Sequence, residues 1–459
     1  MLQIDDTIAA IATAAGPAGL AVVRVSGPGA LAVADAVFEG AAPLAASPSH
    51  RLHHGWAAAR GRRIDEVVAA VFRAPRSYTR EDVVEWSCHG GDVPARRVLD
   101  ALLAAGARLA RPGEFTLRAF LHGRIDLAQA EAVADLIHAA TEHAHDLALA
   151  QLAGGLSRAL HAQADRLADL VAEVEARIDF AEDVGGVEVP AHVVDGIAAA
   201  DQALAALLAG APWARAVREG VRMPVVGRPN VGKSSLFNAL LGEERAIVTP
   251  APGTTRDRVS EAIEIAGVRV TLSDTAGLRA TDEPVEAIGV GLAERAIEGA
   301  GLVLWVIDGS RPLGAEDRAV ASRLAGRPSV VALNKRDLGR AVSESDVMSC
   351  LEDGPRSVVS VSAASGEGVD TLRGAIGERL GAGRGEAALG AAATNPRHVE
   401  ALERARAALG RAAAVARTMP GEIVALELRE ALAAIGEVTG GRVGDDVLER
   451  IFARFCIGK

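Results

Sequence analysis

The nine residues Gly227–Ser235 read GRPNVGKSS and fit the pattern Gly-x4-Gly-Lys-Ser of a phosphate-binding loop. The run VRMPVVG leads into them and predicts a strand, and the apolar spacing after them predicts a helix, which is the setting this loop requires. Glycines in such a turn let backbone N–H groups approach phosphates at a helix N-terminus. The stretch therefore predicts a nucleotide-binding α/β domain in which Lys233 contacts the β- and γ-phosphates and Ser234 binds Mg²⁺.

The chain around this loop has the pattern of a parallel sheet covered by helices. From about residue 221 to 380, four more apolar runs alternate with helical patterns: VRVTLSD, LVLWVID, SVVALNK and SVVSVSA. This alternation is typical of the βαβ units of doubly wound folds. Ligands of such folds bind at the carboxyl ends of the strands, so further binding motifs are expected there.

Three further motifs stand at predicted strand ends. DTAG, at Asp274–Gly277, offers a carboxylate near Mg²⁺ and a backbone N–H for the γ-phosphate. NKRD, at Asn334–Asp337, supplies Asp337, whose carboxylate can accept both the N1–H and the amino group of guanine, a pair that adenine lacks. SAA, at Ser362–Ala364, can contact the guanine oxygen through its backbone. Four motifs in this order predict a GTPase.

The segment TPAPGTTRD, Thr249–Asp257, lies between the first two motifs. Thr254 or Thr255 can place a hydroxyl and a backbone group on the γ-phosphate and Mg²⁺, as switch loops do. Leu278 follows DTAG where Ras-like enzymes have the glutamine that orients the attacking water. Either turnover is slow, or another group or a second protomer supplies that role. The predicted nucleotide contacts are Asn230, Val231, Gly232, Lys233, Ser234, Ser235, Thr249, Pro250, Ala251, Pro252, Gly253, Thr254, Thr255, Asp274, Thr275, Ala276, Gly277, Asn334, Lys335, Arg336, Asp337, Ser362, Ala363 and Ala364.

The residues before and after the α/β block have different patterns. Residues 1–121 mix β-like runs such as LAVVRVSG, EVVAAVF and EDVVEWSCHGG with Gly/Pro turns and a helix near Pro94–Ala105, which predicts an α+β domain. Apolar residues at three-or-four spacing predict helices over about 127–180, with a break at Gly154-Gly155. The same spacing returns over 397–416, 422–438 and 445–456.

Helices on both sides of the α/β block indicate one helical domain with a GTPase domain inserted into it. The expected boundaries are 1–121 for the α+β domain, 122–215 and 384–459 for the helical domain, and 216–383 for the GTPase domain. The predicted fold class is therefore an α/β and α+β multidomain protein.

Composition limits the classes of function. The 459 residues carry a net charge of −11, so a global basic field for nucleic acid is absent and RNA contacts must depend on local patches. The three cysteines have no metal-ligand spacing, and the start MLQIDDTIAA is acidic where a secretion signal is basic. We expect a cytoplasmic protein without a membrane span. Prenylation of Cys456 is not expected, because the terminal FCIGK has Gly458 and Lys459 in the wrong places.

Taken together, the segments resemble the MnmE (TrmE) family of tRNA-modification GTPases. The resemblance covers essentially the whole chain and rests on DDTIAAIAT, VRVSG, SYTREDVVEWSCHGG, RPGEFTLRAFLHGRIDLAQAEAVADLI, GRPNVGKSS, PGTTRD, DTAGLR and the terminal FCIGK. It implies an N-terminal folate-binding, dimer-forming domain, a helical domain, and a GTPase domain inserted into the latter. It also implies a homodimer whose GTPase domains pair transiently in the presence of K⁺.

The resemblance further implies a reaction. With the flavoprotein MnmG (GidA), such proteins add a carboxymethylaminomethyl or aminomethyl group to carbon-5 of the wobble uridine of certain tRNAs. The one-carbon unit comes from a methylene- or formyl-tetrahydrofolate, and the FAD and NADH chemistry belongs to the partner. The implied cofactors of this chain are GTP, Mg²⁺, K⁺ and the tetrahydrofolate derivative.

The resemblance places the folate contacts on Arg24, Glu81, Arg124 and Lys459. A carboxylate suits the donors of a pterin ring, and cations suit its glutamate tail. The basic position more often holds Lys in the family and is Arg124 here. Taken alone, Glu81 and Arg124 would be ordinary surface charges, whereas Arg24 lies inside an apolar strand and should have a partner.

The resemblance also assigns ions and catalytic groups. The implied K⁺ ligands are Asn230, Thr249, Ala251 and Thr254, and the Mg²⁺ ligands are Ser234 and Thr255. The implied catalytic residues are Glu286, Lys233 and Thr255. Glu286 could orient the attacking water that Leu278 cannot, or could be a solvent-facing carboxylate at a helix start.

Two questions stay open at this stage. Cys456 is either a nucleophile near the folate site or a buried cysteine at a helix end. The chain could also be a GTP-driven switch or ribosome-assembly factor without modification chemistry, or a folate-dependent one-carbon transferase that its GTPase domain regulates. Assembly factors usually append a basic RNA-binding module after the GTPase domain, whereas this chain returns to Ala-rich amphipathic helix.

Overall fold

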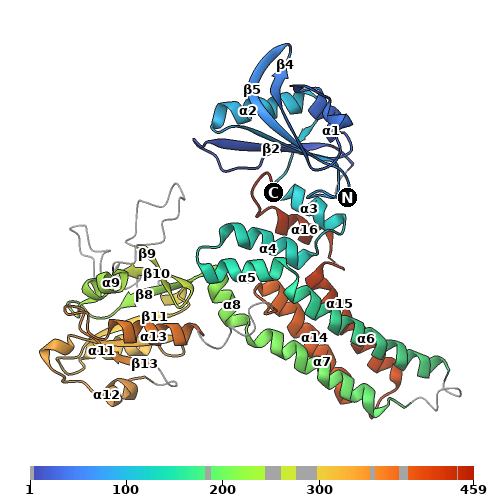
Figure 1. The fold of residues 1–459 in the computed structure, drawn as a ribbon. Helices are drawn as coiled ribbons and strands as arrows, with labels where there is room; N and C mark the ends of the chain where they lie inside the picture. Colours follow the sequence, from blue (N-terminus) through green and yellow to red (C-terminus); the bar gives the residue numbers. More distant parts are fainter. Residues whose placement is uncertain are drawn as a thin grey trace. The chain divides into compact units, whose positions relative to one another are not determined.

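The computed structural model describes residues 5–180, 188–242, 260–274, 297–351, 357–381, 391–441 and 443–459. The chain forms two compact units, whose helices and strands are labelled in Figure 1. The first unit consists of Met1–Ala134, Leu160–Ala168 and Arg429–Lys459, and the second of Asp135–Ala159 and Asp169–Leu428. The first unit thus joins the two ends of the chain.

A seven-stranded sheet forms the centre of the first unit, in the order β3-β4-β5-β6-β2-β1-β7. All its pairs are antiparallel except β1 with β7. The strands are β1 Ile8–Ile11, β2 Leu20–Ser26, β3 Phe38–Gly40, β4 Arg51–Ala59, β5 Arg62–Phe72, β6 Val83–His89 and β7 Arg108–Leu109. The predicted α+β pattern of this region is therefore present, and the runs LAVVRVSG, EVVAAVF and EDVVEWSCHGG supply β2, β5 and β6.

The two faces of this sheet bury different residues because strand side chains alternate. Val23 and Val25 of β2 lie in one core together with residues of α1 Ala30–Asp35 and α2 Asp92–Ala104. A second, small core contains Phe115 of α3 Glu114–Leu121. Arg24, between the two valines, therefore points toward α3, where its guanidinium lies 5.5 Å from the centroid of the Phe115 ring.

Helices and the terminal residues complete the first unit. The helix α16 Asp445–Phe452 packs on α3 and on α4 Leu127–His138 through Leu117, Leu127 and Phe452. The residues after α16 then continue along α3, beside which the C-terminus lies (Figure 1). The helices α6 Gly155–Asp179 and α15 Gly421–Thr439 each contribute residues to both units.

The second unit contains a six-stranded sheet in the order β13-β12-β11-β8-β10-β9. Its strands are β8 Val221–Val226, β9 Ser260–Ile265, β10 Val268–Asp274, β11 Val303–Asp308, β12 Ser329–Asn334 and β13 Ser357–Ser360. All neighbours are parallel except β9 with β10. The five predicted strands are present, and β9 is an antiparallel edge strand that the sequence pattern did not predict.

Both faces of this sheet are covered, as its continuous apolar runs require. Leu304 and Val306 of β11 face a core with α9 Lys233–Leu241, α13 Val369–Leu380, α5 Glu142–Leu152 and α8 Ala211–Glu219. Val303, Trp305 and Ile307 face the opposite core, which also contains residues of α11 Ala315–Arg323 and α12 Glu344–Ser349.

Two long helices, α7 Ala191–Ala209 and α14 Pro396–Val415, pack side by side in the second unit. Arg406 of α14 donates to both carboxylate oxygens of Asp201 of α7, at 2.7 and 3.1 Å. The segment Ala191–Glu219 has the length and hydropathy of a membrane span, but only by composition. Packing of α7 against α14 gives its apolar residues another partner, and the absence of a membrane span stays a prediction.

Candidate functional site

The phosphate-binding loop connects β8 to α9 and is shaped by backbone conformations that favour glycine. Gly227 has φ 151°, and a Cβ there would lie 2.2 Å from the carbonyl oxygen of Val306. Gly232 has φ 93°, and a Cβ there would lie 2.3 Å from Nδ2 of Asn334. Asn230 adopts φ 62°, in the left-handed region that asparagine tolerates. The loop can therefore turn back against β11 and β12 only with glycine at these two places.

Lys233 begins α9 and is buried. Its ammonium donates to the carbonyl oxygens of Gly227 and Arg228, at 2.9 and 2.8 Å. Ser234 follows it in the first turn of α9 and is exposed. The lysine thus spans the loop whose N–H groups would bind phosphates. Ser234, next to it, is placed to bind a metal ion beside those phosphates.

The NKRD and SAA motifs meet the phosphate-binding loop through Asn334, which is 2% exposed. Its amide nitrogen donates to the carbonyl oxygen of Val231 at 2.8 Å. Its amide oxygen accepts the N–H of Ala363 at 2.9 Å. Ser362 donates to Oδ1 of Asp337 at 2.6 Å. One buried amide and one hydroxyl therefore bring three separate sequence motifs to a single edge of the sheet.

Lys335 adds a second link between these motifs. Its ammonium donates to the carbonyl oxygen of Asn230 and to Oδ2 of Asp308, both at 2.8 Å. Burial of Asp308 opposes ionisation, but hydrogen bonds from Lys335 and Ser310 outweigh it and lower the pKa of the carboxyl. Arg336, in contrast, points toward Glu367, with 3.3 Å between their charged atoms.

Several predicted residues fall outside the described part of the chain. Asp274 ends β10 in register with Val225 of β8, so its backbone lies beside the strand that leads into the phosphate-binding loop. The roles predicted for the following residues stay predictions: Thr249, Pro250, Ala251, Pro252, Gly253, Thr254, Thr255, Thr275, Ala276, Gly277 and Glu286.

A second candidate site lies in the first unit, around Tyr78. The guanidinium of Arg24 stands over the Tyr78 ring at 5.0 Å from its centroid, and that of Arg124 at 4.6 Å. Arg124 also donates to the carbonyl oxygen of Tyr78 at 3.1 Å. The Tyr78 hydroxyl is 2.9 Å from the hydroxyl of Thr116 on α3. Two of the residues predicted to bind folate thus flank one aromatic ring.

The C-terminal tail reaches the same place. Arg24 donates to the carbonyl oxygen of Gly458 at 3.3 Å, and the N–H of Phe115 donates to that of Lys459 at 3.2 Å. Gly458 has φ 96°, and a Cβ there would lie 2.3 Å from the carbonyl oxygen of Ile11. The tail therefore folds back onto β1 and α3, a contact the sequence could not predict.

Arg24 and Glu81 each form an ion pair within the first unit. Arg24 of β2 lies opposite Glu85 of β6, and their charged atoms are 2.7 Å apart, which confirms that this strand arginine has a partner. The Glu81 side chain is 11% exposed and 3.0 Å from the fully buried guanidinium of Arg118. The simpler interpretation of Glu81 as an ordinary surface charge is therefore wrong.

Cys456 is exposed and follows the end of α16 by four residues. The interpretation of a buried helix-end cysteine is therefore wrong, because α16 ends at Phe452, whose ring packs against Phe455 instead. The N–H of Gly113 donates to the carbonyl oxygen of Cys456 at 3.3 Å. The backbone of this residue is fixed while its thiol faces solvent.

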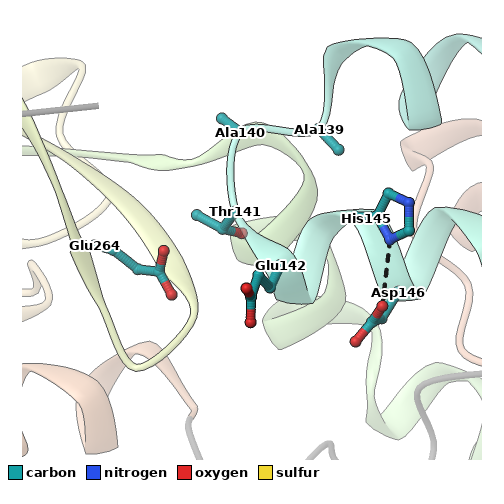
Figure 2. Close-up of a pocket in the computed structure, with 7 residues that line it drawn as sticks. All are labelled: Ala139, Ala140, Thr141, Glu142, His145, Asp146 and Glu264. Atoms are coloured by element: carbon teal, nitrogen blue, oxygen red, sulfur yellow. Dashed lines mark hydrogen bonds and ion pairs between the residues drawn. The ribbon is translucent and has the colours of Figure 1, made fainter. Parts of the chain in front are cut away.

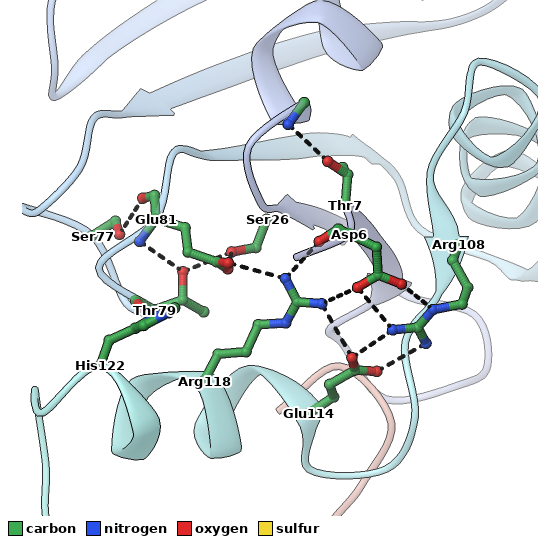
Figure 3. Close-up of polar contacts among 11 residues, drawn as sticks. Asp6, Thr7, Ser26, Ser77, Thr79, Glu81, Arg108, Glu114, Arg118 and His122 are labelled. Carbon is green, nitrogen blue, oxygen red and sulfur yellow. Dashed lines mark hydrogen bonds and ion pairs between the residues drawn. The ribbon is translucent and has the colours of Figure 1, made fainter. Parts of the chain in front are cut away.

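The charged residues around Arg118, which Figure 3 shows together, were not predicted from the sequence. Arg108 donates to both Asp6 and Glu114 at 2.6 Å, and Arg118 donates to the same two carboxylates. Hydrogen bonds from Arg108 lower the pKa of Asp6, and they also lower that of Glu114 although burial opposes it. Arginine within the apolar helix run EFTLRAFL was the signal that could have indicated a buried partner.

A separate open pocket lies in the second unit, where the start of α5 meets β9 (Figure 2). It contains none of the predicted site residues. Its polar lining includes Glu142, Asp146 and Glu264, and His145 lies 3.3 Å from Asp146. Within the described ranges no group of three His, Cys, Asp or Glu residues is arranged to hold a metal ion.

Two family models match this chain and together cover nearly all of it. The MnmE helical domain matches residues 127–456, and the GTP-binding protein TrmE N-terminus matches residues 7–124. The chain belongs to the MnmE family. The "tRNA modification GTPase MnmE" of Symbiobacterium thermophilum is 49% identical over 460 residues, which cover 99% of this chain and 100% of that protein. The protein of the same name from Geobacter sulfurreducens is 46% identical, over 100% of both chains.

Membership of the MnmE family confirms the resemblance and the multidomain fold class predicted from the sequence. The solved G domain of the T. maritima FeoB iron transporter matches 35% of this chain at 26% identity, with a TM-score of 0.26. The assignment therefore rests on the MnmE sequence matches, which extend over the first unit as well as the second.

Proposed function

We propose that this chain is a GTP-hydrolysing tRNA modification enzyme that acts with a flavoprotein of the MnmG type. Together they add a carboxymethylaminomethyl or aminomethyl group to carbon-5 of wobble uridines, using a tetrahydrofolate one-carbon unit. The observation that carries this proposal beyond family membership is the meeting of Arg24, Arg124 and the tail at Tyr78. A GTPase that acts only as a switch has no need of this second site.

GTP binding in this proposal uses the meeting point of the loop motifs. Lys233 would exchange its two carbonyl partners for the β- and γ-phosphates, and Asp337 would accept the guanine donors through the oxygen that Ser362 leaves free. Mg²⁺ would be held by Ser234 and Thr255, where it neutralises charge between the phosphates. The position of Ser234, an exposed residue in the first turn of α9, fits this role.

Hydrolysis in this proposal depends on K⁺ and on pairing of two GTPase domains. Asn230, Thr249, Ala251 and Thr254 would hold K⁺, and Glu286 would orient the attacking water in the absence of a glutamine at Leu278. The cation supplies the positive charge that an arginine finger gives elsewhere. Hydrolysis measured in K⁺ and in Na⁺ buffers of equal ionic strength tests this, and equal rates would contradict it.

Folate binding in this proposal uses charges of both signs. Arg24, Arg124 and Lys459 would bind the glutamate carboxylates or the ring oxygen, and Glu81 would accept donors of the pterin. The fit is good because the Arg24 side chain is 12% exposed and already desolvated, so a carboxylate would displace little water there. Homodimer formation through the first unit completes the proposal.

Cys456 is proposed to take a chemical role beside the folate, because it is exposed on the tail whose Gly458 carbonyl oxygen accepts a hydrogen bond from Arg24. Replacement of Cys456 by Ser should leave GTP hydrolysis and folate binding intact and abolish modification. Normal modification by that variant would leave Cys456 with no chemical role.

The proposal as a whole is tested by nucleoside mass spectrometry of tRNA from a strain that lacks this chain. We expect wobble uridines without the carbon-5 substituent, and their recovery when the chain is restored. Unchanged wobble uridines would contradict the proposal and favour a GTPase switch or ribosome-assembly factor.

A further inference from the structure

Five ionisable side chains, among them Glu81 of the proposed folate site, form a charged cluster around one buried arginine (Figure 3). We call it the Arg118 cluster; it consists of Asp6, Glu81, Arg108, Glu114 and Arg118. The guanidinium of Arg118 is fully buried at its centre. It donates to Asp6 at 2.6 Å, to Glu114 at 3.2 Å and to Glu81 at 3.0 Å.

The Arg118 cluster has three carboxylates and only two guanidinium groups. Asp6 and Glu114 each receive hydrogen bonds from both Arg108 and Arg118. Among the described residues Glu81 is paired with one arginine, Arg118. Glu81 therefore has the fewest arginine partners of the three carboxylates, and it is also the one that the proposed function assigns to ligand binding.

The contacts of Glu81 fix the direction of its carboxylate. Oε1 accepts from Arg118, and Oε2 accepts the hydroxyl of Ser26 at 2.6 Å. Each carboxylate oxygen can accept about two hydrogen bonds, so both oxygens keep capacity for a further donor. Two adjacent N–H groups of one ring, as a pterin presents them, match this remaining capacity.

We propose that Arg118 is a positioning residue of the folate site, which acts through Glu81 without touching the ligand. This inference rests on the proposed folate function. Arg118 holds the Glu81 side chain in one rotamer and anchors it to the segment before β1, because the same guanidinium donates to the carbonyl oxygen of Asp6 at 2.7 Å. Arg108 shares Asp6 and Glu114 with Arg118 but has no contact with Glu81, which makes it a matched control.

The test is a double-mutant cycle on the full chain with 5-formyl-tetrahydrofolate as probe and calorimetry as readout. Arg118→Lys keeps the positive charge but loses the fork that spans Glu81 and Asp6. We expect it to weaken binding about tenfold in the wild-type background and less than about twofold in a Glu81→Gln background. Arg108→Lys should change binding less than about twofold in both backgrounds, while melting temperatures fall for both arginine variants.

A merely structural role of Arg118 would lower affinity by the same factor in both backgrounds, and that result would overturn the inference. If Arg118→Lys does not fold, Ser26→Ala provides the same cycle, because Ser26 orients the other oxygen of Glu81. Equal losses in both backgrounds would again overturn it. Absence of folate binding by the wild-type chain would instead refute the proposed folate function, so the two failures are distinguishable.

Discussion

The two candidate sites are built in different ways. The nucleotide site is formed largely by backbone: Gly227, Asn230 and Gly232 have positive φ, and Asn334 bonds backbone groups of two loops. The site around Tyr78 combines charged and aromatic side chains from β2, the loop before β6 and the segment after α3 with a backbone carbonyl of the tail. The first site should therefore be sensitive to a Cβ atom added within its loop, and the second to the loss of a charged partner or to displacement of the tail.

The largest expected effect is on the backbone-built site. Gly227→Ala places a Cβ 2.2 Å from the carbonyl oxygen of Val306, so the loop must move away from β11. We expect GTP affinity to fall about 100-fold in fluorescent-nucleotide titrations, with folate binding unchanged. Gly374→Ala in α13 is the control, because its Cβ would meet nothing within 4 Å. Wild-type GTP affinity of Gly227→Ala would show that this loop does not bind the phosphates.

A change of the Asp337 side chain at the same site should alter which nucleotide binds and should leave the fold of the loops unchanged. Asp337→Asn replaces the carboxylate oxygen that would accept from guanine by an NH₂ donor. The remaining amide oxygen can still accept from Ser362. We expect weaker GTP binding by about 100-fold and a switch of preference to xanthosine triphosphate. Competition assays with both nucleotides measure this. Unchanged preference for GTP would mean that another residue reads the base.

The side-chain-built site should fail when the tail moves. Gly458 has φ 96°, and the Cβ added in Gly458→Ala would lie 2.3 Å from the carbonyl oxygen of Ile11. The tail must therefore move away from Arg24 in this variant. Affinity for 5-formyl-tetrahydrofolate should fall about tenfold, with GTP hydrolysis unchanged. Gly436→Ala, in α15, has no atom within 4 Å of its Cβ and serves as the control. Folate binding at wild-type strength by Gly458→Ala would remove the tail from the site.

The same difference explains how much of each site could be predicted from the sequence. GRPNVGKSS, NKRD and SAA are contiguous motifs, so their letters alone indicated the residues that Asn334 now joins. Tyr78 and Arg118 have partners far away in the chain, and no local spacing indicates them. Glu81 was predicted as a ligand only through the family resemblance, and its burial could not be predicted locally, since its partner Arg118 lies 37 residues later.

The same reasoning explains the misjudged elements. The edge strand β9, Ser260–Ile265, has the sequence SEAIEI, which mixes charged and apolar residues and lacks the apolar run of a central strand. Cys456 was expected within a helix because Asp445–Cys456 is amphipathic, but α16 ends at Phe452 so that Phe455 can fill the core with α3.

The smallest expected effect is on the acid stability of the first unit. The pKa of Glu114 is lowered in the folded state, so its contribution to the unfolding free energy is present above its ordinary pKa of about 4.3 and is lost as pH falls through the lower folded value. In Glu114→Gln the acid slope below about pH 4.3 should be shallower in urea unfolding. The exposed Glu449→Gln is the control. An identical slope in Glu114→Gln and wild type would contradict the role of this ion pair.

The central claim is that the two sites serve one reaction on tRNA. It is tested most directly by restoring the deletion strain with Gly227→Ala, with Glu81→Gln, or with the wild-type chain, and measuring wobble-uridine modification by nucleoside mass spectrometry. We predict that the wild-type chain restores the carbon-5 substituent and that neither variant does, although each keeps the ligand of the other site. Full modification with either variant would contradict the account.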